Sequence, residues 1–180
     1  MSEVTAIAHP NFALIKYWGK ANSGQNIPAM SSISLTIDTL ISTTKISKKP
    51  EIQETIWILN GEHQPDLGQI LPTLDYLSEV GEVGEPCLIK SDNNFPTAAG
   101  LASSASGVAS IVVAYNRFFD LGLTNKQMTK AAMLGSGSAP RSLLPGIVLL
   151  DMENQFDCQT LVEPNQWPLS VIVCITDDQR

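Results

Sequence analysis

The sequence contains little cysteine and histidine, the residues from which zinc sites and many hydrolase triads are built. Its three cysteines, Cys87, Cys158 and Cys174, are odd in number and lack the paired spacing of a zinc knuckle, so we expect buried, reduced thiols. The two histidines, His9 and His63, do not accompany a recognisable nucleophile elbow. Thiolate metal chemistry and Ser-His-Asp hydrolysis are therefore disfavoured.

Positive charge is also scarce. The 180 residues include 11 Lys and Arg against 18 Asp and Glu, a formal net charge of −7. Nucleic acids and anionic membranes require a basic footprint, so neither is expected as a partner. A small phosphorylated ligand needs only a few local cations, because physiological salt screens charges beyond about 8 Å. The candidate cations are Lys16, Lys20, Lys90 and Arg141.

Long hydrophobic runs are missing as well. Apolar stretches such as GIVLL and SVIVCI are far too short to span a bilayer. The N-terminal MSEVTAIAHP has neither the basic lead nor the apolar core of a secretory signal, so we expect a cytoplasmic protein. Hydrophobic residues still make up 43% of the chain and charged residues 16%, which is typical of a globular protein. At this length we expect one domain over residues 1–180.

Short apolar groups separated by turn residues predict extended segments, most of them in the first sixty residues. These segments are 4–18 with a break at Pro10, 31–37, 43–48, 55–59, 86–92, 146–152 and 168–176. Asn60-Gly61 directly after the fourth segment predicts a tight turn, because this pair readily adopts positive φ.

Three stretches have the spacing of amphipathic helices. Residues 66–80 carry leucine and isoleucine at helical intervals, although Pro72 should kink or shorten that helix. A second helix is expected from Gly100 to Phe119. Thr124 and Gln127 form a capping-box pattern before a third helix that ends ahead of Gly135. Strands and helices together predict an α+β fold.

The stretch NNFPTAAGLASSASG, residues 93–107, is nearly free of charge and built from small residues. Small side chains let a ligand approach main-chain N–H groups, and a helix N-terminus adds a favourable dipole for anions. The stretch lies between a predicted strand and a predicted helix, so an anion cradle is one interpretation. A tight turn with close helix packing is the other. The Walker pattern is absent because no lysine lies in GLASSASG.

A second small, polar turn, GSGSAP at 135–140, begins like a dinucleotide-binding fingerprint. Pro140 replaces the last glycine and a helix precedes the turn, so we reject the Rossmann interpretation. Arg141 follows this turn directly. An isolated arginine is usually a surface charge, but its rigid fork also suits a pair of carboxylate or phosphate oxygens.

The segment ALIKYWGK, residues 13–20, places two cations close together. In a strand, Lys16, Trp18 and Lys20 would share one face and Tyr17 would point the other way. An amphipathic edge strand with solvated lysines explains this pattern. Two cations on one face would also suit a polyanionic ligand.

Taken in order, Asn11 with ALIKYWGK, then SDNNFPTAAGLASSASG, then GSGSAPRS closely resemble the mevalonate diphosphate decarboxylase family of the GHMP kinase superfamily. The resemblance runs from about residue 5 to the end. It implies the GHMP kinase N-terminal fold, which is similar to domain 2 of ribosomal protein S5, with a mixed or antiparallel sheet and helices on one face. It also implies a homodimer for the full-length family.

The activity that the resemblance implies is the ATP-dependent decarboxylation of mevalonate 5-diphosphate to isopentenyl diphosphate, with Mg²⁺. Phosphoryl transfer needs positioning and charge neutralisation more than covalent help, which fits a cradle of N–H groups. ATP would contact the first small-residue loop, and Ser104 would also lie near the metal. By this resemblance the ATP-binding residues are Asn94, Pro96, Ala98, Ala99, Gly100, Leu101, Ala102, Ser103 and Ser104.

The resemblance also assigns residues to the substrate. Arg141 would grip the carboxylate, and Lys16 would lie near the transferred phosphate or the hydroxyl region of the substrate, so both are expected to be catalytic. Trp18 would pack under the site. The substrate-binding residues would be Tyr17, Lys20, Ser136, Gly137, Ser138 and Arg141.

The sequence departs from the family pattern in two ways. Pro140 and Pro145 replace small residues beside Arg141, so its backbone geometry is expected to differ. The family's Asp-Ala-Gly-Pro-Asn motif, which carries the catalytic aspartate, does not occur in these 180 residues. We therefore expect this chain alone to be inactive or nearly so.

Several alternatives follow from these departures. The chain could be an expressed fragment, a truncated gene product or one part of a complex. Its function could be that of a related GHMP kinase, such as a mevalonate 3-kinase, or of a non-catalytic nucleotide-binding module. A truncated domain that associates through an uncovered apolar surface is a further alternative.

Overall fold

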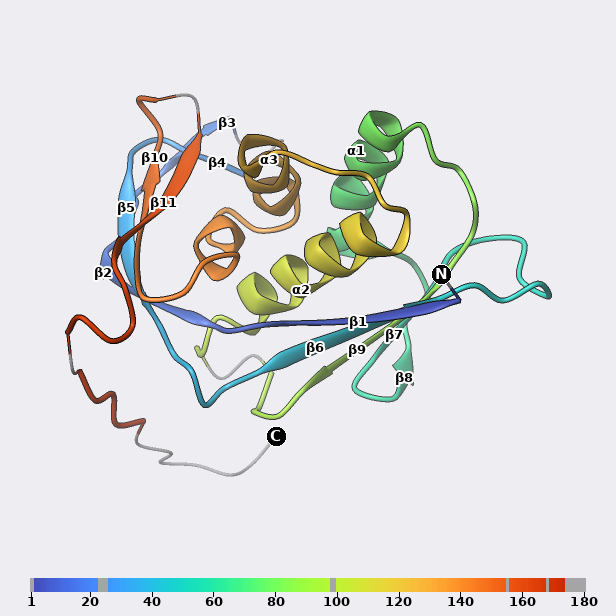
Figure 1. Ribbon diagram of the computed structural model, residues 1–180, viewed down its shortest axis with the longest axis horizontal. Coiled ribbons are helices and arrows are strands. Elements are labelled where there is room, and N and C mark those ends of the chain that lie inside the picture. Colours follow the sequence, from blue (N-terminus) through green and yellow to red (C-terminus); the bar gives the residue numbers. More distant parts are fainter. Residues whose placement is uncertain (1, 23–25, 98–99, 155, 168, 174–180) are drawn as a thin grey trace.

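The computed structural model of the chain describes residues 2–22, 26–97, 100–154, 156–167 and 169–173. Within these residues, three α-helices cover one face of a five-stranded sheet, and a four-stranded sheet lies beside them (Figure 1). The chain passes from the first sheet to the second at Pro10, between β1 and β2, so the expected break there is confirmed. The predicted α+β fold is confirmed as well.

The larger sheet has the strand order β1-β6-β9-β7-β8. Its strands are β1 (Glu3–Ala8), β6 (Ser42–Ser47), β9 (Leu88–Asn93), β7 (Ile56–Leu59) and β8 (Glu62–His63). The pair β7/β9 is parallel and the other pairs are antiparallel, so the sheet is mixed. Alternate residues of β6, namely Ser42, Thr44 and Ile46, are buried, which is the period of two expected when helices cover one face.

The helices begin where local chemistry favours it. They are η1 (Gly68–Ile70), α1 (Leu71–Gly81), α2 (Ser103–Phe118), α3 (Asn125–Gly135) and η2 (Ala139–Ser142). Pro72 stands in the first turn of α1, where a missing N–H breaks no helical bond, so it shortens the predicted helix without kinking it. Thr124 and Gln127 form the predicted capping box at the start of α3.

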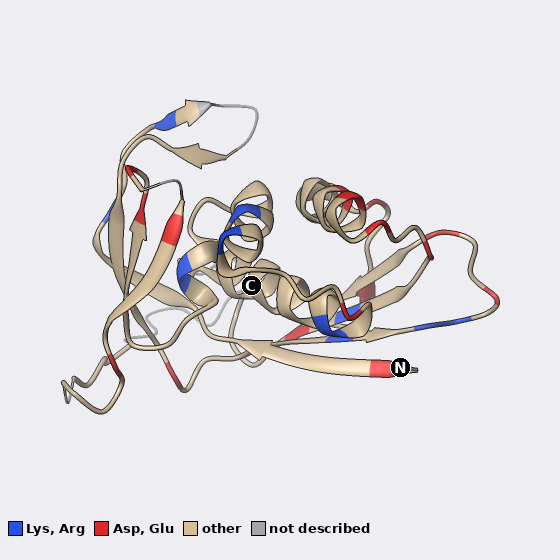
Figure 2. Cartoon of the chain, turned by 45° about the horizontal axis from the view of Figure 1, so that its top comes forward, with Lys and Arg blue, Asp and Glu red and all other residues tan. Residues whose placement is uncertain are grey.

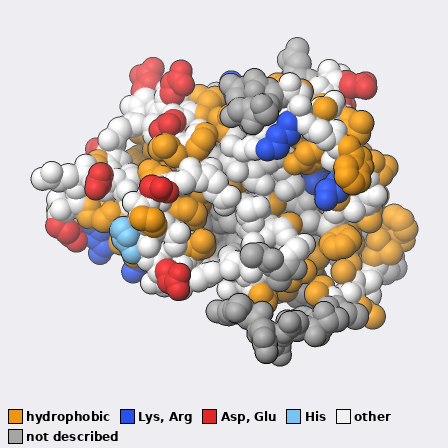
Figure 3. Space-filling model, turned by 180° about the vertical axis from the view of Figure 1, so that it is seen from behind, with side chains coloured by type: hydrophobic (Ala, Val, Ile, Leu, Met, Phe, Trp, Pro, Cys, Tyr) orange, Lys and Arg blue, Asp and Glu red, His pale blue; other side chains and the backbone are white. Residues whose placement is uncertain are grey.

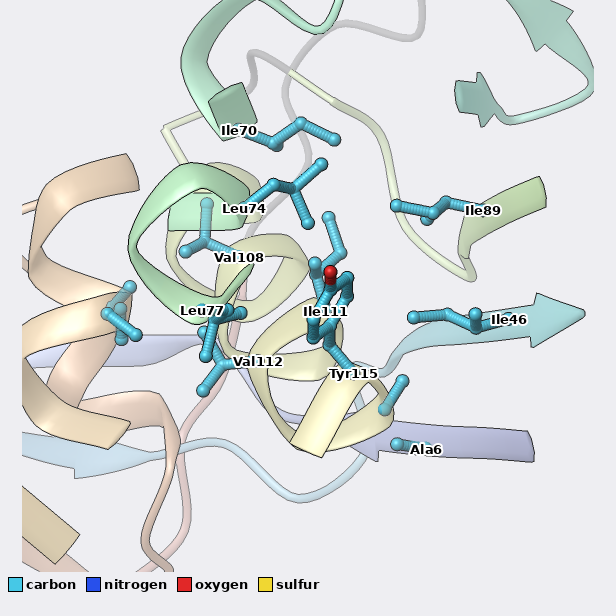
Figure 4. Packing of buried hydrophobic residues seen from close by; sticks show 14 of the residues in the cluster. Ala6, Ile46, Ile70, Leu74, Leu77, Ile89, Val108, Ile111, Val112 and Tyr115 are labelled. Carbon is cyan, nitrogen blue, oxygen red and sulfur yellow. The ribbon is translucent and has the colours of Figure 1, made fainter. Parts of the chain in front are cut away.

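The main core lies between the larger sheet and the helices. Ile46 of β6 and Ile89 of β9 point toward Ile111 and Tyr115 of α2, and Leu77 of α1 packs on the other side of α2 (Figure 4). Burying one such aliphatic side chain contributes about 1.5–3 kcal/mol. This contact fixes α2, and with it the loop that precedes α2, against the end of β9.

The smaller sheet has the order β11-β10-β5-β2 and is antiparallel throughout. Its strands are β2 (Asn11–Ile15), β5 (Ser32–Thr36), β10 (Ile147–Asp151) and β11 (Asp157–Val162). Val148, Leu150 and Cys158 on its inner face form a second cluster with Met133 of α3. Two short strands, β3 (Lys20–Asn22) and β4 (Ile27–Pro28), pair separately.

The smaller sheet leaves apolar side chains exposed. Phe12, Leu14 and Ile15 of β2 are each more than half exposed. Figure 3 shows hydrophobic side chains gathered on the edge of the molecule where this sheet lies, whereas acidic side chains gather on the opposite edge. Basic residues appear on β3, α3 and η2, and acidic ones on α1 (Figure 2). No described helix combines the length and the apolarity that crossing a membrane requires.

One predicted strand is wrong. The described part of 168–176, residues 169–173, forms no strand, and Ile172 is 87% exposed. An apolar, β-branched run becomes a strand only when another strand's edge is available, and no described strand pairs with this one. The strands β3, β4, β8 and β11 were not predicted, because the first three have only two or three residues and β11 lacks a clear alternation of polar and apolar residues.

Candidate active site

Three sequence motifs meet at one pocket of about 500 Å³. Lys16 and Tyr17 line it from the segment after β2, Gly100 and Ala102 from the loop before α2, and Ser138 and Arg141 from the turn after α3. These residues lie up to 125 positions apart in the chain (141 minus 16), so only the fold brings them together. The rest of the lining comes from β2 itself: Asn11, Phe12 and Ala13.

Arg141 is held rigidly at the base of this pocket. Only 1% of its surface is exposed, in contrast to the surface position that is usual for arginine. One terminal nitrogen donates to Ser32 Oγ, and the other donates to Asn11 Oδ1 at 3.2 Å. Asn11 Nδ2 in turn donates to Ser142 Oγ at 2.7 Å and to the Ser138 carbonyl at 3.1 Å. The fork of the guanidinium is therefore fixed by two buried polar residues.

One nitrogen of the buried guanidinium forms no hydrogen bond with a described residue. This nitrogen is Arg141 Nε, which is itself buried. Burial lowers the pKa of the Arg141 side chain from its ordinary value, and nearby Cys158 and Tyr17 act in the opposite direction. A buried cation without an acidic partner is costly, so an anion entering the pocket would relieve this cost.

Pro140 fits the turn without loss of a needed hydrogen bond. It lies in the first turn of η2, where no N–H donor is required, and its carbonyl accepts the Cys158 Sγ–H at 3.2 Å. Pro145 similarly uses its carbonyl to accept the Thr160 hydroxyl at 3.1 Å. Both prolines are thus accommodated beside a fully buried Arg141.

Gly137 permits a close approach of three segments. A Cβ atom at this position would lie 2.6 Å from Tyr17 Oη and 2.8 Å from the Asn26 carbonyl oxygen. Asn26 also donates to the Leu134 carbonyl at 3.0 Å and accepts from Lys20 Nζ at 2.7 Å. Tyr17, Lys20 and Gly137 therefore gather around Asn26. Ser136 and Ser138 lie next to them, with their hydroxyl oxygens 3.4 Å apart.

The loop before α2 presents main-chain donors. Gly100 has φ +75 with open space around it, and Ala102, the N-cap of α2, has φ 53. No side chain caps this helix, and its first turn contains no acidic residue. Ala105 and Ser106 donate their N–H groups to the Ala102 carbonyl at 3.0 and 3.3 Å. Among the described residues, the N–H groups of Ser103 and Ser104 have no such partner, and with the helix dipole they favour an anion.

A smaller pocket, about 110 Å³, lies on the sheet side of the same helix start. Ser103 and Ser104 line it together with Thr97, Asn93 and Trp57. Trp57 is buried, and its Nε1–H has no hydrogen-bond partner among the described residues. A buried donor without an acceptor costs about 1–3 kcal/mol, so this pocket also suits a polar ligand.

The remaining predicted ATP contacts are positioned differently. Asn94 donates to the Thr39 carbonyl at 3.1 Å and accepts the Ile41 N–H at 2.7 Å, so its side chain is engaged in holding the β5–β6 connection. Pro96 and Leu101 line neither of the two pockets. Ala98 and Ala99 lie outside the described residues.

The groups at the start of α2 indicate how Mg²⁺ would be bound there. Magnesium prefers oxygen ligands and usually shares them between protein and substrate phosphates. The Ser104 hydroxyl lies at the helix start, where phosphates would be bound. The described ranges contain no group of three His, Cys, Asp or Glu side chains suited to a metal. A hydroxyl plus phosphate oxygens is therefore the donor set that these residues fit.

Two expectations for the segment after β2 are wrong. β2 ends at Ile15, so Lys16 and Tyr17 do not alternate across a strand, and both line the same pocket. Gly19, with φ +80, turns the chain before β3 begins at Lys20. Trp18 is 74% exposed and does not pack under the site, because no described element covers it. Lys16 Nζ lies 5.8 Å from the Trp18 ring centre.

The thiols are buried where the structure describes them. Cys87 and Cys158 are free and buried, which confirms the expectation for these two, and Cys174 lies outside the described residues. Burial raises the pKa of Cys87 to about 11 and that of Cys158 to about 12. Such thiols are poor nucleophiles and poor metal ligands near neutral pH.

Sequence reasoning missed Asn26, Ser32 and Trp57. Ser32 and Asn26 act through contacts with residues more than a hundred positions away, Arg141 and the Leu134 carbonyl, and nothing local indicates such partners. Trp57 was interpreted only as part of a strand. Asparagine directly before a strand signal is a common turn residue, so Asn26 carried no distinctive signal.

Comparison with known proteins places these motifs in one family. A family model, the diphosphomevalonate decarboxylase-like N-terminal domain, matches residues 8–161. The diphosphomevalonate decarboxylase of Eremothecium gossypii is 37% identical, and the match covers 94% of this chain and 48% of the relative.

Solved structures agree with this match. MDDEF in complex with MVAPP, AMPPCP and magnesium has a TM-score of 0.79 at 35% identity, covering 89% of this chain and 50% of that one. Mevalonate diphosphate decarboxylase from Staphylococcus aureus has a TM-score of 0.81 at 34% identity, covering 91% and 51%. The chain thus spans about half the length of these relatives, and the predicted fold and resemblance are confirmed. It belongs to the family of diphosphomevalonate decarboxylase-like N-terminal domains.

Proposed function

We propose that this chain forms the ATP- and substrate-binding part, residues 1–180, of an enzyme that decarboxylates mevalonate 5-diphosphate to isopentenyl diphosphate. ATP would be consumed, and ADP, phosphate and carbon dioxide would be released. The observation that carries the proposal is the pocket where Lys16, Tyr17, Gly100, Ala102, Ser138 and Arg141 meet. A cationic fork, an ammonium and a helix N-terminus converge there, as a substrate with a carboxylate and phosphates requires.

The substrate would be held mainly by the turn after α3 and by the segment after β2. Arg141 would bind the carboxylate, because Ser32 and Asn11 engage only two of its five N–H groups and its Nε has no partner among the described residues. Ser136, Gly137 and Ser138 would lie at the diphosphate, with Tyr17 and Lys20 closing around it. Lys16 would neutralise charge that develops near the transferred phosphoryl group.

MgATP would occupy the start of α2. Its phosphates would accept hydrogen bonds from the N–H groups of Gly100 to Ser104, and Ser104 would supply a hydroxyl to Mg²⁺. The small pocket beside Trp57 would receive another polar part of the nucleotide. When bound, ATP supplies the phosphoryl group that converts the substrate hydroxyl into a leaving group. This chain's residues orient that group and exclude water.

The proposal is tested by measuring binding and turnover together. Isothermal titration of mevalonate 5-diphosphate should detect binding to the unaltered protein and a loss of about 100-fold in affinity for Arg141→Met, because a charged hydrogen-bonding partner is removed. Arg117→Met, at the far end of α2, is the matched control and should leave affinity unchanged. Equal affinity of the Arg141→Met variant would contradict the assigned role.

Turnover distinguishes the proposed reaction from its relatives. A polypeptide of only these 180 residues lacks the aspartate motif, so we expect no measurable product from it. A longer form that includes the relatives' other half should release carbon dioxide and ADP in equal amounts. Release of ADP without carbon dioxide would instead indicate a mevalonate 3-kinase. The cytoplasmic location and a homodimer of the longer form stay predictions.

A further inference from the structure

A buried ladder of hydroxyl groups joins α2 to the first sheet. Its upper rung consists of Ser42 of β6, Asn93 at the end of β9 and Ser106 in the first turn of α2. Ser42 Oγ lies 2.5 Å from Asn93 Oδ1 and 2.6 Å from Ser106 Oγ. Ser42 and Ser106 are at most 1% exposed. One side chain thus contacts both Asn93, where the small-residue loop starts, and the helix that follows this loop.

The direction of the hydrogen bonds follows from the inventory of donors. Each serine hydroxyl has one proton, and Asn93 Oδ1 can only accept. Ser42 must therefore donate to Asn93, which leaves its oxygen to accept from Ser106. Ser106 also lies 3.3 Å from the Ser103 carbonyl, but the 2.6 Å contact with Ser42 is the stronger. The chain Ser106 to Ser42 to Asn93 is thus polarised in one direction.

The backbone next to Ser42 also forms hydrogen bonds with the start of this loop. Ile41 donates its N–H to Asn94 Oδ1 at 2.7 Å, and its carbonyl accepts the Asn94 N–H at 3.1 Å. Ile41 and Ser42 therefore bind the residues on which the loop starts, Asn93 and Asn94, and Ser42 also binds the helix on which it ends. Asn93 and Ser103 both line the small pocket beside Trp57.

We propose that Ser42 is a positioning residue for the nucleotide: it sets the start of α2 at a fixed distance from the end of β9, so that the first-turn N–H groups face the phosphates. The inference rests on the proposed function, since it concerns the same ATP site. Ser42 does not touch the nucleotide itself. It acts through Ser106 and Asn93.

A lower rung of the same ladder provides a control for this proposal. Two residues further along β6, Thr44 lies 2.7 Å from Ser110 of α2 and 3.0 Å from Ser91 of β9. Ser110 is as buried as Ser106 and lies one helical turn further from the loop. Ser91 of this lower rung lines the small pocket, whereas Ser110, in the middle of α2, lines neither pocket, so the control is the Ser110 hydroxyl. Removing it should weaken the fold without moving the nucleotide site.

The test compares Ser42→Ala and Ser106→Ala with Ser110→Ala in the natural full-length protein. Affinity for Mg²⁺ with AMPPCP is measured by isothermal titration, and stability by the midpoint of thermal unfolding. All three variants should lower the midpoint. Only Ser42→Ala and Ser106→Ala should weaken nucleotide binding, by about tenfold, which corresponds to about 1.4 kcal/mol. Ser42→Thr keeps the hydroxyl and should restore affinity to within twofold.

The outcomes separate the two proposals. Unchanged affinity in Ser42→Ala, or an equal loss in Ser110→Ala, overturns the positioning role while the proposed function stands. Absence of binding by the unaltered protein overturns the proposed function, and the positioning role with it. If Ser42→Ala does not fold, Ser106→Ala decides the matter, because it breaks the same hydrogen bond from the helix. A Ser42→Ala/Ser106→Ala double variant no weaker than either single one supports a shared action.

Discussion

The two small-residue loops look alike in sequence but differ in how they are packed. In the loop before α2, the described residues 94–97 and 100–102 are exposed or half-buried except for Phe95, and no described atom lies within 4 Å of where a Cβ of Gly100 would be. The turn after α3, residues 135–142, is largely buried, and a Cβ on Gly135 or Gly137 would collide with its neighbours. Glycine keeps space open in the first loop and lets segments close together in the second.

This difference suits the two ligands that we propose. The first loop offers main-chain N–H groups to phosphates, so its surroundings must be open. The second loop fixes Arg141 and the serines through packing, which holds charged and polar side chains at defined positions. The same residue type therefore supports access in one place and rigidity in the other.

The largest effect is expected from Gly135→Ala. A Cβ there would lie 2.7 Å from Thr73 Oγ1 and 2.8 Å from Val108 Cγ1, where α1, α2 and α3 meet. Overpacking of this kind should lower the free energy of unfolding by about 3 kcal/mol. Urea unfolding measures it. Gly84→Ala, which meets no atom within 4 Å, is the control and should have almost no effect. Similar values for both would show that the second loop is not tightly packed.

Gly137→Ala should affect function more than stability. The new methyl group would displace Tyr17 from the turn or push back the Asn26 backbone, at a cost of about 1–2 kcal/mol. Affinity for mevalonate 5-diphosphate should fall about tenfold, because roughly 1.4 kcal/mol of binding energy goes with the displaced contacts. Titration with Mg²⁺ and AMPPCP should give the unaltered value. A loss of both affinities would mean that the two loops are not independent.

The pH dependence of stability should show that water is excluded from the interior of the second loop. Cys158 donates to Pro140 of this loop, and its pKa rises from 9.0 unfolded to about 12 folded. Below pH 9 both states keep the proton. Above pH 9 only the unfolded state loses it, so the stability from Cys158 falls as pH rises from 9 to 12, by at most about 1.4 kcal/mol per pH unit.

This pH effect is isolated by comparing unfolding curves of the unaltered protein and Cys158→Ala. Their difference should be constant from pH 7 to 8 and shrink above pH 9. Cys87, whose pKa is about 11, contributes equally to both unfolding curves, so its effect cancels in their difference. A difference that does not change with pH would show that water reaches the thiol behind the second loop.

The smallest effects are expected in and after the first loop. Gly100→Ala forces an L-residue into φ +75 without a clash and should destabilise by about 1 kcal/mol. Gly107→Ala places a better helix former in α2 where no atom lies within 4 Å, so it should stabilise by about 0.5–1 kcal/mol. Chemical denaturation measures both. Destabilisation by Gly107→Ala would show that α2 is packed as closely there as at Gly135.

Local chemistry was enough to predict much of the secondary structure. Pro10 separated β1 from β2, Asn60-Gly61 ended β7, and the Thr124 capping box began α3, because each signal acts within a few residues. The apolar run at 169–173 was misinterpreted as a strand because pairing depends on a distant edge, which a local pattern does not contain. β11 was missed because its polar residues lie on a half-exposed face.

The sequence by itself determined which groups are present: the small loops, the lysines after β2, Arg141 and the family to which they point. Only the tertiary structure decided that Lys16 and Tyr17 border the same pocket, that Arg141 is buried between Asn11 and Ser32, and that Ser42 joins both ends of the first loop. The physical reason is that composition and short-range spacing act along the chain. Burial, hydrogen-bond partners and close approach depend on segments that meet only in the folded state.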